Sequence, residues 1–204
     1  MKERGMIFNG EMVRAILDGR KTQTRRPIKW KQTRFTEIGE REDGSKWPWS
    51  EDAEHACDFW HPCPFGAVGD RIWVREAFRV HSRATDVATL VYKASERNSW
   101  TEQTRRVPVA VCNKPATPEK WTPSLHMPRW ASRILLEITG VRVERLRSMS
   151  QDDARAEGVT AASGPMEAGL AFRELWDSIY GEESWKANPW VWVIEFKRVE
   201  GGAA

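Results

Sequence analysis

The sequence predicts an α+β fold in which short strands form a mixed β-barrel with flanking helices and long insertions. Short stretches with strand-like alternation are spread along the 204 residues, whereas two stretches have the spacing of amphipathic helices and a third has a capping box. Strands and helices do not alternate regularly, which argues against a doubly wound parallel sheet. The length suits one domain, so we expect a single domain over residues 1–204 with insertions at about 28–66 and 81–130.

The N-terminal part begins with a helix and continues into a basic string. Apolar residues recur on one helical face over residues 12–17, and Gly19 follows as a stop signal. The basic string at 21–26 ends before a proline. Residues 28–66 are polar, contain scattered tryptophans and show weak periodicity, so we expect a long loop or an insertion outside the barrel.

The middle of the chain contains strand candidates that follow a turn signal. Gly69 and Asp70 form that signal, and a proline-rich passage at 115–128 follows the last candidate. Strand propensity and alternation predict strands at Arg71–Glu76, Ala77–Val80, Val87–Tyr92 and Val107–Val111.

The C-terminal part contains two further strand patterns. Residues 132–146 alternate apolar and polar side chains about Gly140, which is typical of a half-buried strand or of a hairpin. Residues 190–199 carry aromatic and aliphatic side chains on one face and charged side chains on the other, which predicts a closing strand.

Two helices are predicted between these strand patterns. Ser150 and Asp153 have the spacing of a capping box for a short helix that ends near Gly158. An apolar stripe over residues 168–179 predicts a second helix, and Gly181 stops it.

The charge distribution permits a nucleic-acid surface without requiring one. The formal net charge is only +3. Residues 20–34 hold seven bases and no acid, but residues 35–66 hold eight acids against two bases. The second block could therefore neutralise the first within the fold.

The composition predicts a cytoplasmic protein without membrane contact. Three cysteines, an odd number, argue against a secreted disulfide framework. The longest apolar run is the five residues 190–194, which is too short to span a membrane, and the first twenty residues contain no signal-peptide core.

The basic string contains a candidate nucleophile and base. Lys21 and Thr24 lie three residues apart beside Arg26. A neutral lysine amine next to a threonine hydroxyl is a workable base and nucleophile, although a solvated basic loop is the alternative. A phosphate-binding P-loop is excluded because Arg20 separates Gly19 from Lys21.

Two further residues are candidates for a site. Glu157 ends the helix that Ser150 begins, where the negative end of the helix dipole is expected to raise the pKa of its carboxyl group and suit it to carry a proton. The alternative is an ordinary solvated glutamate. His126 lies between two prolines, where it could bind a ligand or be a structural histidine.

A group of histidines and cysteines has the elements of a zinc site. Its members are His55, Cys57, His61 and Cys63. Ligands at every second residue close poorly around one tetrahedral ion, so we predict no metal site.

Taken together, these segments resemble the ASCH domain, a PUA-like β-barrel. The resemblance rests on Gly19-x-Lys21-Thr22-x-Thr24-x-Arg26, the strand entry at Gly69-Asp70, the helix ending at Glu157 and the closing strand Val193–Lys197. Within that family the chain is most similar to the small bacterial N4-acetylcytidine amidohydrolases. The strings HMPRWASR and GDRIWVRE also resemble ASCH-type proteins common in phages and prophages.

The resemblance implies an amidohydrolase that converts N4-acetylcytidine and related N4-acylcytidines to cytidine and a carboxylic acid. It implies catalytic roles for Lys21, Thr24 and Glu157, and we expect Arg26, His126 and Trp73 to bind the substrate. The expected partner is a small modified nucleoside, the reaction needs neither a cofactor nor a metal, and we expect a monomer.

Two catalytic schemes are compatible with these residue types. In one, Lys21 takes the proton of Thr24, whose oxygen attacks the acyl carbon, and Glu157 protonates the leaving cytidine and then activates water. In the other, Glu157 activates water directly while Lys21 and Thr24 bind the oxyanion. A helix C-terminus just before Lys21 favours the charged amine, which counts against the first scheme, and the sequence alone does not separate the two.

Other functions and a wider substrate range are also compatible with the sequence. A non-catalytic RNA-binding PUA-like module is one alternative, because the basic residues 20–34 include Trp30, and a ribonuclease of the same fold is another. The tryptophans of the insertions could line a pocket for bulky acyl groups or merely anchor the insertions. They are Trp30, Trp47, Trp49, Trp60, Trp100 and Trp121.

Overall fold

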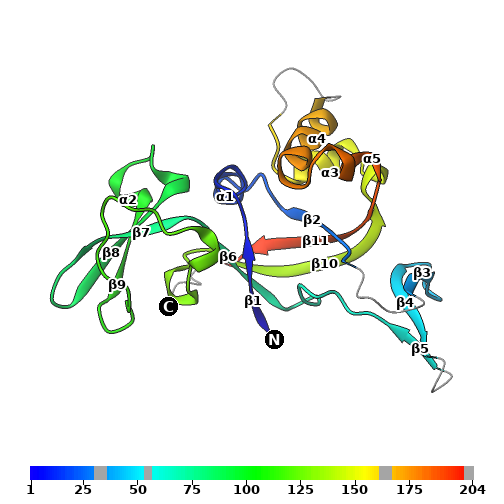
Figure 1. The fold of residues 1–204 in the computed structure, drawn as a ribbon, viewed down its shortest axis with the longest axis horizontal. Helices are drawn as coiled ribbons and strands as arrows, with labels where there is room; N and C mark the ends of the chain where they lie inside the picture. Colours follow the sequence, from blue (N-terminus) through cyan, green and yellow to red (C-terminus); the bar gives the residue numbers. More distant parts are fainter. Residues whose placement is uncertain (30–35, 53–56, 161–166, 200–204) are drawn as a thin grey trace. The chain divides into compact units, whose positions relative to one another are not determined.

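The structure, a computed structural model, describes residues 1–29, 36–52, 57–160 and 167–199. Within these ranges the fold is α+β, with five α-helices and eleven strands, which confirms the predicted class (Figure 1). The chain divides into two compact units. Unit 1 contains Met1–Gly19, Arg71–Glu137 and the residues from Arg198 on, and unit 2 contains Arg20–Asp70 and Ile138–Lys197.

The first sheet of unit 1 is built on β6. Strand β1 (Glu3–Ile7) lies parallel to β6 (Arg71–Arg75), and the first residues of β10 (Leu135–Arg145) lie antiparallel to β6. Ile72 and Val74 of β6 are buried, as the alternation in the sequence predicts.

Helix α1 (Gly10–Leu17) follows β1 and begins at Asn9. The side-chain oxygen of Asn9 accepts a hydrogen bond of 2.8 Å from the backbone N–H of Met12, which satisfies a free donor of the first turn. The predicted apolar face is buried. Gly19, with a φ of +75°, then turns the chain away from the helix.

The second sheet of unit 1 is antiparallel and lies mostly within the predicted insertion at 81–130. It consists of β7 (Phe78–Arg83), β8 (Val87–Tyr92) and β9 (Thr104–Pro108), and α2 (Trp100–Gln103) precedes β9. The C-terminal boundary of the strand predicted at Val107–Val111 is wrong, because β9 ends at Pro108. The N–H of Val111 closes a turn on the carbonyl oxygen of Pro108 at 3.0 Å, so the strand stops there.

The main sheet of unit 2 brings the basic string beside the closing strand. Strand β2 (Gln23–Pro27) lies antiparallel to β11 (Trp190–Arg198), and β11 is hydrogen-bonded to β10. Strand β10 continues through Gly140 as one strand, so the hairpin alternative is wrong. A Cβ at position 140 would lie 2.7 Å from Oε2 of Glu195, so the glycine makes room for a neighbouring side chain.

Three helices cover one side of this sheet (Figure 1). They are α3 (Gln151–Ala156), α4 (Glu167–Tyr180) and α5 (Glu182–Lys186). Phe172 and Trp176 of α4 are buried in one cluster with Val191 and Val193 of β11. The predicted capping box of α3 is confirmed, with hydrogen bonds of 3.0 Å between Ser150 and Asp153 in both directions.

A small three-stranded sheet in unit 2 corrects one of the two expectations for residues 28–66, that of a long loop, and leaves that of an insertion. Strands β3 (Thr36–Glu40), β4 (Lys46–Asp52) and β5 (Cys57–Trp60) are antiparallel. A Cβ at Gly39 would lie 2.9 Å from the ring of Trp60. The tryptophans that looked scattered in the sequence therefore pack across strands, and this packing stabilises the sheet.

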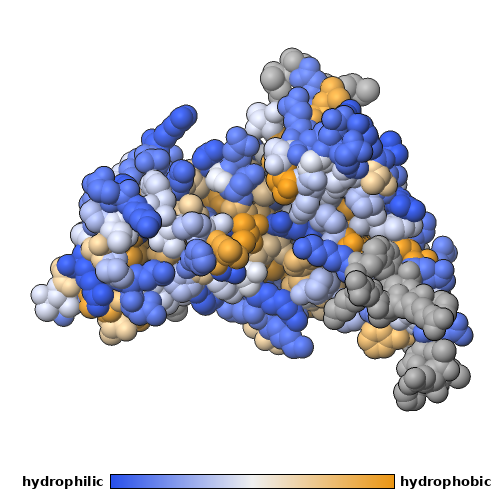
Figure 2. All heavy atoms as spheres, viewed as in Figure 1, coloured by the Kyte–Doolittle hydropathy of each residue, from blue (hydrophilic) through white to orange (hydrophobic). Residues whose placement is uncertain are grey.

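The predicted closure into a barrel is not found among the described strands. In unit 1 the sheet ends at β1, and in unit 2 it ends at β2, each with a neighbour on one side only. Figure 2 shows a face on which hydrophilic residues predominate. None of the helices in the described ranges is long and apolar enough to cross a membrane.

Candidate active site

Backbone hydrogen bonds in unit 2 hold the end of α3 against the segment that leads into β2. Lys21 and Glu157 form an isolated antiparallel bridge, and the N–H of Thr22 donates to the carbonyl oxygen of Ala156 at 2.8 Å. Glu157 is the C-cap of α3, and Gly158, with a φ of +86°, follows it. The left-handed turn at Gly158 ends the helix and fixes Glu157 beside the basic string.

The side chains of Lys21 and Glu157 form a buried ion pair. Nζ of Lys21 donates to Oε2 of Glu157 at 2.7 Å and to the carbonyl oxygen of the same residue at 2.8 Å. The side chains are 0% and 2% exposed, respectively. The structure therefore brings together two of the three residues to which the sequence assigns catalysis.

Arg25 holds the second oxygen of the same carboxylate. Its Nη1 lies 3.2 Å from Oε1 of Glu157, and its Nη2 lies 2.5 Å from Oε1 of Glu144 and 3.4 Å from Oδ1 of Asp153. The guanidinium is fully buried. Lys21 and Arg25 together clamp Glu157, because each cation binds a different carboxylate oxygen.

The network continues outward to partly exposed residues. Arg142 binds Oδ1 of Asp153 at 2.8 Å and also forms ion pairs with Glu144 and Glu195. Nε2 of Gln23 donates to the carbonyl oxygen of Asp153 at 2.8 Å. Thus the acids that contact Lys21, Gln23 and Arg25 come from β10 and from α3 with its C-cap.

The environment shifts the pKa of Lys21 and of Asp153. Burial lowers the pKa of the Lys21 amine, the charge of Glu157 opposes this effect in part, and the charges of Arg26 and Arg25 reinforce it. Burial opposes the ionisation of Asp153, but hydrogen bonds from Ser150 and Gln23 hold the pKa of its carboxyl group well below the usual value. The site therefore holds a lysine whose proton is easier to remove than usual.

Thr24 lies on the other face of β2. Residues alternate between the two faces of a strand, and Gln23 and Arg25 both reach the acids of the network. Thr24 is buried opposite Ile194 of β11, on the face that Arg26 shares. The structure therefore does not place the Thr24 hydroxyl on the side of the Lys21–Glu157 pair.

The three predicted substrate-binding residues fall in different surroundings. Arg26 is half-buried opposite Trp192. Trp73 lies on β6 in unit 1, where its ring occupies the space over Gly5. His126 lies in a short 3₁₀-helix of unit 1 and lines a pocket there. Substrate binding by these residues stays a prediction.

Sequence reasoning missed Arg25 and Asp153 as members of the site. The capping role of Asp153 already accounts for an acid at this position in the sequence. Its ion pairs with Arg25 and Arg142 were therefore not expected. The available signal for Arg25 was the alternation Lys21, Gln23, Arg25, which places all three on one face of an extended segment.

The histidines and cysteines considered for zinc lie partly outside the described residues. His55 is among the residues not described, and so is the side chain of Cys57. Nε2 of His61 is 2.9 Å from Oγ of Ser50, and Cys63 is buried without a disulfide. In the described ranges no group of three or more histidine, cysteine or acidic side chains has the arrangement of a metal site.

Comparisons with known protein families, with curated proteins and with solved structures find no match for this chain.

Proposed function

We propose that this protein is an amidohydrolase of the ASCH type, with a PUA-like fold, that cleaves the N4-acyl amide of N4-acetylcytidine and related N4-acylcytidines. The observation that carries the proposal is the buried Lys21–Glu157 pair, whose partners are 136 residues apart in the chain. These are two of the catalytic residues that the resemblance implies. A buried, charged pair is costly to maintain, and such groups cluster at functional sites.

The pair supplies what hydrolysis of this amide requires. The carboxylate of Glu157 takes a proton from water as the water oxygen bonds to the acyl carbon. The carbon–nitrogen bond then breaks, and the same proton passes to N4 of the departing cytidine. Lys21 in its charged form stabilises the negative oxygen that develops on the acyl group.

The placement of Thr24 favours attack by water over attack by threonine. Lys21 would have to reach the Thr24 hydroxyl to activate it, but both hydrogen bonds of Nζ go to Glu157. Thr24 faces the other side of β2. The scheme in which Glu157 activates water needs no movement of the strand.

The contacts of the basic string do not favour RNA binding. Lys21 and Arg25 are buried and paired with acids, so their charges are not displayed to a phosphate backbone. An RNA surface or a ribonuclease site would therefore have to use other cations of the basic residues 20–34, such as the exposed Arg20 and Lys29.

The experiment measures the absorbance change as N4-acetylcytidine is converted to cytidine. Wild-type protein should turn over, and Lys21→Met and Glu157→Gln should each lower kcat/KM by about 100-fold or more. Lys186→Met and Glu183→Gln are matched controls, because these residues form an exposed pair at 3.0 Å in the same unit. No turnover by the wild type, or equal losses in the controls, would refute the proposal.

Mass spectrometry of wild-type protein quenched during turnover separates the two schemes. If Thr24 is the nucleophile, an acetyl ester forms on Thr24 in every cycle, and brief mixing with saturating N4-acetylcytidine followed by acid should trap it. Direct attack by water leaves the protein unmodified.

A further inference from the structure

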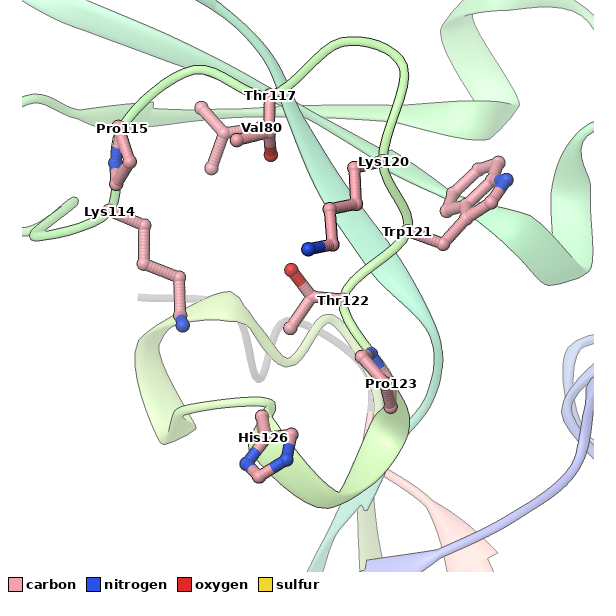
Figure 3. Close-up of a pocket in the computed structure, with 9 residues that line it drawn as sticks. All are labelled: Val80, Lys114, Pro115, Thr117, Lys120, Trp121, Thr122, Pro123 and His126. Carbon is pink, nitrogen blue, oxygen red and sulfur yellow. The ribbon is translucent and has the colours of Figure 1, made fainter.

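A pocket in unit 1 gathers basic and hydroxyl side chains. Its volume is about 280 Å³, and its lining includes Lys114, Lys120, Thr117, Thr122 and His126. Figure 3 shows the amines of Lys114 and Lys120 and the hydroxyl of Thr122 directed toward one space, with the ring of His126 at its rim. These side chains offer several hydrogen-bond donors to a single small ligand.

Backbone hydrogen bonds to β7 hold the segment that carries these side chains. The N–H of Thr117 donates to Val80 O at 2.9 Å, and Thr122 exchanges two hydrogen bonds with Phe78, of 2.7 and 3.2 Å. Lys120 lies between these two attachment points. The wall of the pocket is therefore formed before any ligand binds, which lowers the entropic cost of binding.

The electrostatic character of the pocket is positive. Its lining contains no carboxylate, and neither Lys114 nor Lys120 forms an ion pair with an acid in the part of the chain that the structure describes. Two guanidinium groups lie at the border: Arg83 donates to the carbonyl oxygen of Lys114 at 3.3 Å, and Arg79 stacks on Trp121 at 4.5 Å. Among the described residues, the amines of Lys114 and Lys120 thus have no carboxylate counter-ion.

We propose that this pocket binds a phosphate monoester. Two ammonium groups, two hydroxyls and an imidazole exceed what the two oxygens of a carboxylate can accept, whereas a phosphate group has enough oxygens and carries more charge. Val80 and Pro123 give the pocket an apolar side that suits the organic part of the ester. The inference uses neither Lys21 nor Glu157, the pair on which the amidohydrolase proposal rests, and shares only His126 with the substrate-binding residues predicted from the sequence.

The test is calorimetric titration of the whole protein with three ligands that share an aromatic ring. Phenyl phosphate should bind, benzoate should bind more weakly, and benzyl alcohol should not bind, all at constant ionic strength. Inorganic phosphate, titrated separately, should bind more weakly than phenyl phosphate because it lacks the apolar part. Benzoate binding as tightly as phenyl phosphate, or no binding of phenyl phosphate at millimolar concentration, would overturn the proposal.

Substitutions locate the site. Lys114→Met and Lys120→Met should each weaken phenyl phosphate binding about tenfold, the effect of one charge-assisted hydrogen bond. Lys93→Met is the control, because Lys93 is an exposed lysine of unit 1 that does not line the pocket. An equal loss in this control would overturn the proposal by showing attraction to the general charge of the surface. Lys120 is exposed, so its variant decides the matter even if Lys114→Met fails to fold.

Discussion

Nη1 of Arg25 lies 3.2 Å from Oε1 of Glu157, on the oxygen that Lys21 leaves unoccupied. The carboxylate is therefore fixed in position and orientation, because both of its oxygens bind buried cations. A group held in this way cannot rotate to suit different partners. Disturbing the network around Glu157 should accordingly have large measurable effects on stability and activity.

Replacing Arg25 by Met should destabilise the protein by about 3 kcal/mol, since it removes a fully buried cation that compensates the buried Glu157 and the partly exposed Glu144. Urea denaturation measures this change. Arg155→Met is the control on α3: its ion pair with Asp152 is exposed, so we expect a change of no more than about 0.5 kcal/mol. Similar losses in the two variants would contradict the role of burial.

The stability contributed by Lys21 should increase with pH on the alkaline side. Burial lowers the pKa of its amine in the folded protein below the ordinary value of 10.5, so the unfolded chain holds the proton to higher pH. Between the lowered pKa and 10.5 the unfolded state binds more protons, and the free energy of unfolding rises with pH. The measurement is the difference between wild type and Lys21→Met in urea denaturation across that interval.

The contribution of Lys186 to the free energy of unfolding should change with pH in the opposite direction to that of Lys21. Hydrogen bonds to Glu183 and Glu182 raise the pKa of its amine, so its contribution is present below the ordinary value and declines above it. Two results would contradict this prediction: a difference in the free energy of unfolding between wild type and Lys21→Met that does not change with pH, or one that changes with pH as it does for Lys186→Met. Either result would show that burial does not destabilise the charged Lys21 amine.

Removing the hydroxyl of Tyr92 should cost about 1–2 kcal/mol, because a buried carbonyl would lose its partner. The hydroxyl donates to the carbonyl oxygen of Ala131 at 2.7 Å inside the core of unit 1. Thermal or urea unfolding of Tyr92→Phe measures the loss. Tyr180→Phe is the natural control, since Tyr180 is the only other tyrosine of the chain and is partly exposed. An unchanged Tyr92→Phe would mean that Ala131 finds another donor.

Replacing Trp47 by Ala should lower stability by about 2 kcal/mol, less than for a fully buried tryptophan. Its ring meets Trp192 edge-on at a centroid distance of 5.2 Å, and Arg41 stacks on it at 4.2 Å. These contacts support the anchoring role of Trp47 over a role in binding bulky acyl groups. Trp100→Ala, at a site 52% exposed, should cost less than about 1 kcal/mol. A Trp47→Ala variant that keeps its stability but loses activity toward N4-benzoylcytidine alone would reverse this interpretation.

Local signals predicted the elements whose causes are local. The capping box of Ser150 and Asp153 and the apolar stripe of α4 are set by neighbours a few residues apart, so α3 and α4 were predicted, whereas the short helices α2 and α5 were not. The strands at 36–60 were missed because their stability comes from pairing between tryptophans on different strands, which no short window of sequence contains.

The candidate site likewise depends on contacts between residues that are distant in the sequence, and these could not be predicted from neighbouring residues. Lys21 and Glu157 were paired through a resemblance, since nothing in their immediate neighbours shows that they meet. The clamp by Arg25 escaped prediction because it depends on which acids of β10 and α3 face β2. Those contacts are a property of the assembled sheet.

The separation of 136 residues between Lys21 and Glu157 also constrains how the molecule is made. On the ribosome, β2 emerges long before β11, with which it pairs from Gln23 to Pro27. Until that strand and α3 exist, the nascent chain must keep Lys21 and Arg25 hydrated, because no acid of the network is yet available. Closing so long a loop is slow, and the burial of these cations therefore belongs to the last stage of synthesis.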